Sequence, residues 1–304
     1  MFIGNQEINN LFEKVVLDNG LAQVYCFSGL DQVGKKTMAI KMASQLLGTK
    51  EEEIDRHSDF YFLNRGLDEK TGKERRDISV SQIRTLRSFL QNQSWQGGWR
   101  IVVIDDAEFL NEESGNALLK SLEEPGGKTI FFLLTRNDDS LLPTIRSRSE
   151  VWQFLPVSEE EIIAGLVAVG CGEELANRIS FLSSGRPGRA IEFFRDENKL
   201  RNWEEEIARW HELWKKPLHE RMKSLESIIG EKDESESKEI RLQKIINVWI
   251  EEGRRMLREE IMVMNRKDNL SLLLKVIDVL GESRDMLRQN INAKMIMEKI
   301  MLQF

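Results

Sequence analysis

The stretch Phe27-Ser-Gly29-Leu-Asp-Gln-Val-Gly34-Lys35-Lys36-Thr37 nearly matches the phosphate-binding loop pattern G-x-x-x-x-G-K-S/T. Residues 22–27 (AQVYCF) before it form a short apolar run typical of a strand, and residues 38–47 after it have the spacing of an amphipathic helix. Strand, glycine loop and helix, in that order, are the context that such a loop requires. The sequence therefore predicts a phosphate-loop fold; the alternative is a glycine turn that binds no ligand.

Four residues of this loop are candidates for holding a nucleotide. Gly29 and Gly34 allow the backbone to curl around a polyphosphate, and Lys35 is placed to reach the outer phosphates. Lys36 breaks the pattern, because an ammonium has no lone pair to offer the Mg²⁺ ion that a Ser or Thr hydroxyl would bind. Thr37 follows about 100° further around the helix, so its hydroxyl is a poor substitute. Whether this vestigial-looking site still binds ATP is left open.

A second strand pattern ends in acidic residues. Residues 100–104 (RIVVI) are typical of a buried parallel strand, and Asp105 and Asp106 follow directly. Ligands of α/β sheets bind at such carboxyl ends, so Asp105 is expected to order Mg²⁺ and Thr135, which closes a further strand, to lie beside the nucleotide. Asp106 stands where a Glu would polarise the attacking water, and its side chain is one methylene shorter. The alternative is that these acids only solvate the end of the strand.

Strand and helix patterns alternate through the first half of the chain. Further strands are predicted at residues 59–63 and 129–135. Helices are predicted at residues 79–91 and 112–123. Such alternation is typical of a parallel sheet flanked by helices. We therefore predict an α/β domain over residues 1–156.

From residue 157 onward the pattern is helical. Residues 157–197 predict a small helical lid domain, with a capped first helix starting at Ser158. Residues 198–304 predict an all-α domain, interrupted by the charged run 230–238. Three methionines near the end are interpreted as core packing: Met295, Met297 and Met301.

Composition limits the classes of function. The 304 residues, 40% hydrophobic and 31% charged, suffice for two or three globular domains. The net charge of −7 argues against broad, autonomous nucleic-acid binding, which needs a surplus of Lys and Arg. The two cysteines, Cys26 and Cys171, cannot build a disulfide framework or a four-cysteine metal site. With no signal-peptide pattern and no run of 18 apolar residues, we expect a cytoplasmic protein with no membrane contact.

Several runs along the chain together resemble one known family. The matching runs are Gly4-Asn5-Gln6, Gly29 to Lys35, Asp105-Asp106-Ala107-Glu108, Asn116-Ala-Leu-Leu-Lys120, Leu122-Glu-Glu-Pro125, Ser147-Arg148-Ser149, Ser184-Gly-Arg-Pro187-Gly-Arg-Ala190 and Leu287-Arg-Gln-Asn290-Ile-Asn292. With these runs the chain resembles the delta-prime subunits of bacterial DNA polymerase III clamp loaders, which are AAA+ proteins. The resemblance implies that residues 1–156 are an AAA+ domain, that residues 157–197 are its lid, and that residues 198–304 form an oligomerising collar.

The resemblance also assigns a role to Arg148. In the family a Ser-Arg-Cys motif supplies an arginine in trans to the ATP of the adjacent subunit, and Arg148 stands at that position, with Ser149 in place of the cysteine. The cofactor implied is therefore ATP with Mg²⁺ at a neighbouring subunit interface. A permanently charged, forked guanidinium suits this task.

Departures from active relatives imply a subunit with no ATPase of its own. The nucleotide-sensing arginine of active relatives would align near Gly188, with Arg189 one place off. Together with Lys36 and Asp106, this indicates a rigid stator rather than a motor. Zinc-binding cysteines, which family members often have near residues 47–59, are absent from this sequence, so no zinc site is predicted.

The partners implied are the clamp-loader motor (gamma/tau) and delta subunits, the sliding clamp, and primer-template DNA, mainly through the assembled complex. Direct DNA contact by the basic stretch from Lys73 to Arg87 is left open, since such a run is usually a solvated face. Two other functions are also left open: an active AAA+ ATPase motor of the clamp-loader or branch-migration type, and a phosphoryl-transferring kinase. Positions 36 and 106 distinguish the stator from the motor.

Overall fold

The computed structural model describes residues 3–18, 20–67, 75–91, 98–125, 127–230, 237–263, 267–288 and 291–304. The chain divides into two compact units, Met1–Arg195 and Asp196–Phe304. Each unit has hydrophobic clusters of its own. The lid helices belong to the first unit, and the predicted domain boundary at residue 156 stays a prediction.

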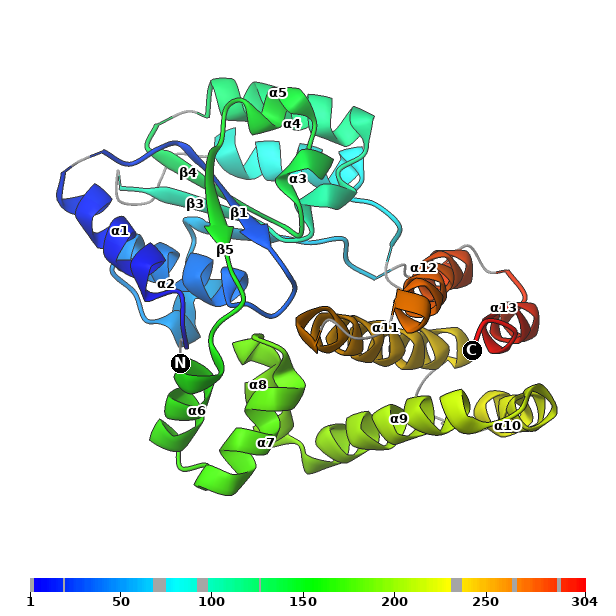
Figure 1. The fold of residues 1–304 in the computed structure, drawn as a ribbon. Helices are drawn as coiled ribbons and strands as arrows, with labels where there is room; N and C mark the ends of the chain where they lie inside the picture. Colours follow the sequence, from blue (N-terminus) through cyan, green and yellow to red (C-terminus); the bar gives the residue numbers. More distant parts are fainter. Residues whose placement is uncertain are drawn as a thin grey trace. The chain divides into compact units, whose positions relative to one another are not determined.

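The first unit is built on a five-stranded parallel sheet with the order β2-β3-β4-β1-β5 (Figure 1). The strands are β1 (Val24–Gly29), β2 (Phe60–Leu63), β3 (Arg100–Ile104), β4 (Thr129–Thr135) and β5 (Glu150–Phe154). All residues of β3 and β4 are buried, which explains why these strands are continuous apolar runs in the sequence. The predicted α/β class with a parallel sheet is confirmed.

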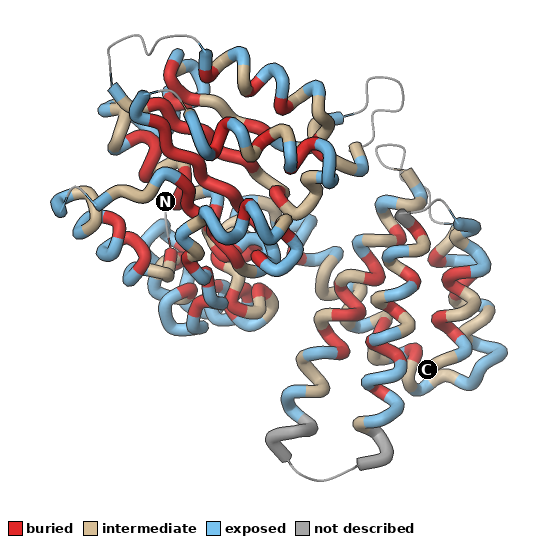
Figure 2. The backbone as a smooth tube through the Cα atoms, turned by 90° about the horizontal axis from the view of Figure 1, so that it is seen from above, coloured by how far each residue is buried: buried red, intermediate tan, exposed pale blue. Residues whose placement is uncertain are grey.

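Helices pack on both faces of this sheet because alternate strand residues point to opposite sides. Tyr25 and Phe27 share a cluster with residues of α1 and α2, whereas Cys26 and Val102 share one with residues of α3, α4 and α5. Figure 1 shows α1 and α2 on one face of the sheet and α3, α4 and α5 on the other. The strands that carry them are deeply buried (Figure 2). The helices are α1 (Gln6–Leu17), α2 (Lys35–Leu47), α3 (Val80–Gln91), α4 (Glu112–Glu123) and α5 (Pro143–Arg146), with 3-10 turns η1 (Glu51–Arg56), η2 (Ala107–Phe109) and η3 (Asp138–Ser140).

The sequence analysis missed strand β5 and the short helix α5. Trp152 and Phe154 of β5 are buried, but Glu150 and Gln153 are exposed, so the strand has no continuous apolar run. This alternation is typical of an edge strand. β5 pairs with β1, which places β1 between β4 and β5. The phosphate loop therefore leaves the sheet from an interior strand.

Three helices complete the first unit: α6 (Glu159–Ala168), α7 (Glu173–Ser183) and α8 (Pro187–Arg195). The Oγ of Ser158 accepts a hydrogen bond from the amide of Glu161 at 3.2 Å, which confirms the predicted cap. The sequence predicted a helical segment over residues 157–197, with its first helix starting at Ser158.

All regular secondary structure in the described residues of the second unit is helical. Its helices are α9 (Glu197–Lys215), α10 (Leu218–Gly230), α11 (Lys238–Val263), α12 (Lys267–Arg288) and α13 (Ala293–Met301). Met297 and Met301 are fully buried in its core, but Met295 is 65% exposed, so the core interpretation was wrong for Met295. Most of the charged run 230–238 lies outside the described residues. In the described part of the chain, no helix combines the length and apolarity needed to cross a membrane.

Candidate functional site

The phosphate loop connects β1 to α2. A side chain at Gly29 would bring its Cβ within 2.2 Å of the carbonyl oxygen of Phe154, so only glycine allows β5 to approach here. Gly34, with φ of 103°, caps α2 in a left-handed conformation that also favours glycine. The Nζ of Lys35 donates to the carbonyl oxygens of Gly29 and Leu30, the latter at 2.9 Å. The lysine thus ties the loop into a closed turn, and burial lowers the pKa of Lys35.

Lys36 lies beside the first acid of β3. Its Nζ is 3.9 Å from Oδ2 of Asp105 and 4.1 Å from the centre of the Phe62 ring, which favours a cation over its face. Burial, and next the charge of Asp106, raise the pKa of Asp105. An ammonium therefore lies against the acid that would order a metal ion. Thr37 lies half-buried in the first turn of α2.

Asp106 is bound to an arginine that the sequence analysis did not single out. The Nε of Arg65 donates to Oδ2 of Asp106 at 3.0 Å, and the guanidinium of Arg65 lies 4.0 Å from the centre of the Phe109 ring. Asp106 itself has a φ of 56°, a left-handed conformation that costs free energy for a residue with a Cβ. The carboxylate expected to serve as a degraded catalytic base is thus one partner of an ion pair.

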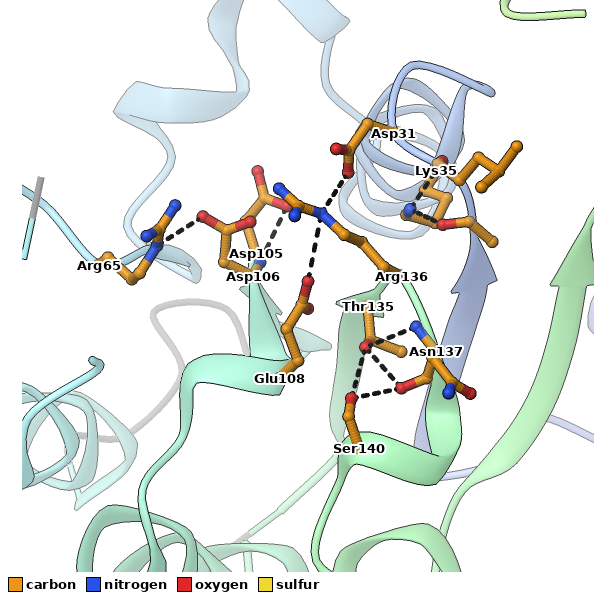
Figure 3. Close-up of polar contacts among 12 residues, drawn as sticks. Asp31, Lys35, Arg65, Asp105, Asp106, Glu108, Thr135, Arg136, Asn137 and Ser140 are labelled. Carbon is orange, nitrogen blue, oxygen red and sulfur yellow. Dashed lines mark hydrogen bonds and ion pairs between the residues drawn. The ribbon is translucent and has the colours of Figure 1, made fainter. Parts of the chain in front are cut away.

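Arg136 was also missed, and it is the central cation of the site (Figure 3). Its Nε donates to Oδ1 of Asp31, a loop residue, at 2.9 Å, and lies 3.5 Å from Oε1 of Glu108. Although burial opposes the shift, the carboxylates of Asp31 and Glu108 raise the pKa of Arg136. The strand register explains its place, because Thr135 pairs with Ser28 and the next residue of each strand therefore lies alongside.

Thr135 lies next to this arginine, but its hydroxyl serves a local turn. Its Oγ1 donates to the carbonyl oxygen of Asn137 at 3.0 Å and accepts from the amide of Asn137 at 3.2 Å (Figure 3). The side chain is 1% exposed. Its predicted part in nucleotide binding stays a prediction.

The residues present do not fit the Mg²⁺ ion that accompanies nucleotides in phosphate-loop proteins. The hydroxyl ligand is replaced by Lys36, and the candidate acids already face cations of the chain. The site balances four carboxylates with four cations: Asp31, Asp105, Asp106 and Glu108 with Lys35, Lys36, Arg65 and Arg136. Over the described residues, no group of three or more His, Cys, Asp or Glu side chains could hold a metal ion. A divalent cation would therefore meet no net negative charge at this site.

The lid is bonded directly to the phosphate loop. The amide of Gly188, in the first turn of α8, donates to the carbonyl oxygen of Gln32 at 2.8 Å. The Nε2 of Gln32 donates to Oε2 of Glu192 on the same helix at 2.9 Å. We call these contacts of Gln32, Gly188 and Glu192 the lid latch. Gly188, near which the resemblance expects the nucleotide-sensing arginine of active relatives, is thus packed against the loop, and Arg189 is buried.

Arg148 lies outside this charge cluster. It follows α5, is 41% exposed, and donates to Oε1 of Glu123 at 2.7 Å and to the carbonyl oxygen of Thr144 at 3.0 Å. Helix α5 is fixed by Arg146, whose Nε donates to Oδ2 of the buried Asp138 at 2.8 Å. The structure therefore presents Arg148 at the surface on an anchored segment.

Comparison with known proteins gives consistent relatives. A family profile described as "DNA polymerase III, delta subunit" matches residues 4–158. DNA polymerase III subunit delta' of Escherichia coli is 33% identical over 143 residues, covering 47% of this chain and 41% of that protein. That of Haemophilus influenzae is 36% identical over 119 residues, covering 38% and 36%. The matches thus span about two fifths of these relatives' lengths. A DNA polymerase III gamma subunit-related protein of Thermotoga maritima shares the fold, with 20% identity, a TM-score of 0.50, and coverage of 96% and 97%.

Proposed function

The chain belongs to the DNA polymerase III delta-subunit family, and we propose that it is a non-motor subunit of a clamp loader. In this role it assembles with gamma/tau and delta subunits and helps load a sliding clamp onto primed DNA. The AAA+ fold, with its helical C-terminal part, provides the framework. Its own phosphate loop is structural rather than catalytic.

The observation that carries the non-motor proposal is the lid latch. A nucleotide can drive a lid only if it binds the open and closed arrangements with different affinities. Here the chain's own backbone and side chains join Gln32 to Gly188 and Glu192, so movement of the lid away from the loop would have to break these bonds. The paired acids Asp105 and Asp106 support the same conclusion, because both already face cations.

We further propose that Arg148 acts on the Mg²⁺-ATP of a neighbouring subunit. Its guanidinium is exposed, permanently charged and able to contact two phosphate oxygens at once. Glu123 and Thr144 orient the side chain before any partner arrives, which lowers the entropy cost of ordering it. An arginine supplied in trans contributes roughly 10³- to 10⁵-fold to turnover in other NTPases.

The test is ATP turnover by this chain alone and mixed with its partner subunits, clamp and primed DNA. We expect no turnover by the chain alone and stimulation of the mixture, which Arg148→Ala reduces by roughly 10³-fold or more at the neighbouring site. The matched control is Arg201→Ala, which removes another exposed arginine paired with an acid, Glu205. Gel filtration verifies that each variant still joins the complex.

Two outcomes would contradict this proposal. Turnover by the isolated wild-type chain would mean that Lys36 and Asp106 are tolerated and that the protein is a motor. Equal stimulation by wild type and Arg148→Ala, in complexes of the same composition, would remove the trans-acting role from Arg148.

A further inference from the structure

Two carboxylates of the nucleotide site come from distant segments and meet at one cation. Asp31 belongs to the phosphate loop, and Glu108 belongs to the turn η2 after β3. The Nε of Arg136 is 2.9 Å from Oδ1 of Asp31 and 3.5 Å from Oε1 of Glu108 (Figure 3). The guanidinium therefore lies between the phosphate loop and the acidic end of β3. In phosphate-loop NTPases a metal ion would be held at this place.

Glu108 depends on this cation because it is nearly buried. Its side chain is 11% exposed, and among the described residues neither carboxylate oxygen accepts a hydrogen bond. A buried carboxylate is costly unless an opposite charge lies close to it. The positive charge of Arg136 thus offsets the free-energy cost of burying the Glu108 carboxylate.

A second cation, Lys36, also stands where a metal ion would be held. Lys36 occupies the sequence position of the missing metal-binding hydroxyl, and its ammonium lies 3.9 Å from Asp105. The Phe62 ring holds the ammonium there through its π face. Three acids, Asp105 and Glu108 after β3 and Asp31 in the phosphate loop, therefore each lie close to a cation of the chain.

We infer that Arg136, supported by Lys36, is a built-in cation that takes the place of the divalent metal ion and excludes metal-bound nucleotides from this site. The guanidinium lies between Asp31 and Glu108 and offsets part of their combined charge, so it holds the loop beside β3. Loss of the guanidinium leaves an excess of negative charge that a divalent cation can neutralise. This role stands whether or not Arg148 serves a neighbour's ATP.

The test is Mn²⁺ binding to the purified full chain, measured by electron paramagnetic resonance, with thermal unfolding in EDTA and in Mn²⁺ as a second readout. Arg136→Gln keeps a polar side chain but removes the charge. We expect it to bind Mn²⁺ roughly tenfold or more tightly than wild type. Its midpoint of unfolding should fall in EDTA and rise with Mn²⁺, whereas that of the wild-type chain should not respond to Mn²⁺.

Two matched variants separate charge from shape. Arg136→Lys keeps the positive charge and should behave like wild type toward Mn²⁺. Adding Glu108→Gln to Arg136→Gln removes an acid and should abolish the acquired Mn²⁺ binding. If Arg136→Gln fails to fold, Lys36→Thr decides the question, because Lys36 is 57% exposed and its replacement leaves the core intact.

The expected result for Lys36→Thr is also a gain of Mn²⁺ binding over wild type. Mn²⁺ binding by wild type as tight as by Arg136→Gln would overturn the inference. So would equal Mn²⁺ affinities of Arg136→Gln and Arg136→Lys, or, where Arg136→Gln does not fold, no gain in Lys36→Thr.

Discussion

Gly188→Ala should loosen the lid by forcing α8 away from the phosphate loop. The added Cβ would lie 2.9 Å from the carbonyl oxygen of Gln32 and 3.1 Å from its Cβ. Contacts this short cannot be relieved by a side-chain rotation alone, because the oxygen belongs to the backbone. The helix must therefore shift, and the 2.8 Å hydrogen bond from the Gly188 amide to Gln32 lengthens or breaks.

The expected loss of unfolding free energy is about 0.5–4.5 kcal/mol. Overpacking a tight contact costs about 1–3 kcal/mol, and losing a hydrogen bond costs about 0.5–1.5 kcal/mol. Alanine recovers up to about 1 kcal/mol through its higher helix propensity. The amide concerned is one of the first-turn donors that have no acceptor inside their own helix, so its loss is not compensated within α8.

Differential scanning calorimetry and hydrogen exchange measure the two consequences. For a unit of this size each 1 kcal/mol lowers the midpoint by about 2–4 °C. Exchange should also quicken at the amides of the first turn of α8, while those of β3 should keep their protection. This local pattern distinguishes a loosened lid from general destabilisation.

Gly281→Ala is the matched control. Gly281 also lies within a helix, α12, but an added Cβ there meets nothing within 4 Å. It should therefore stabilise its own unit by up to about 1 kcal/mol. If Gly188→Ala were equally stabilising, or left hydrogen exchange in α8 unchanged, the lid latch would not hold the lid on the phosphate loop.

Two further predictions concern buried groups in the two units. Although burial opposes the shift, hydrogen bonds from Ser28 and Gln153 hold the pKa of Asp138 below its usual range. The ionised Asp138 therefore contributes its full stabilisation of the folded state above about pH 4. This contribution is lost as the pH falls through the lower pKa that Asp138 has in the folded state. The gap in unfolding free energy between wild type and Asp138→Asn should narrow in acid; a constant gap in denaturant titrations would contradict this. Met297→Ala should lower the unfolding free energy by about 2–5 kcal/mol, whereas Met295→Ala, at an exposed position, should lower it by less than about 0.5 kcal/mol. Denaturant titrations measure both losses, and equal losses would refute the assigned burial.

Much of the sheet and its helices could be predicted because burial leaves a local pattern. The predicted ranges 100–104, 112–123 and 129–135 agree with the bounds of β3, α4 and β4. A strand buried on both faces needs an unbroken apolar run, and Pro125 limits a helix regardless of its surroundings. β5 was not predicted because an edge strand needs only alternate apolar residues, and five residues provide too few of them for a clear pattern.

The sequence by itself determined the phosphate-loop architecture, the family resemblance and the loss of the metal-binding hydroxyl at Lys36, because each depends on residue types at short spacing. Only the tertiary structure decided how the site is neutralised and held. Arg136 and Asp31 are 105 residues apart, and Gln32 and Glu192 are 160 apart. An ion pair or a close contact between such residues leaves no periodic trace in the chain, because it depends on where parallel strands and the lid bring their ends together in space.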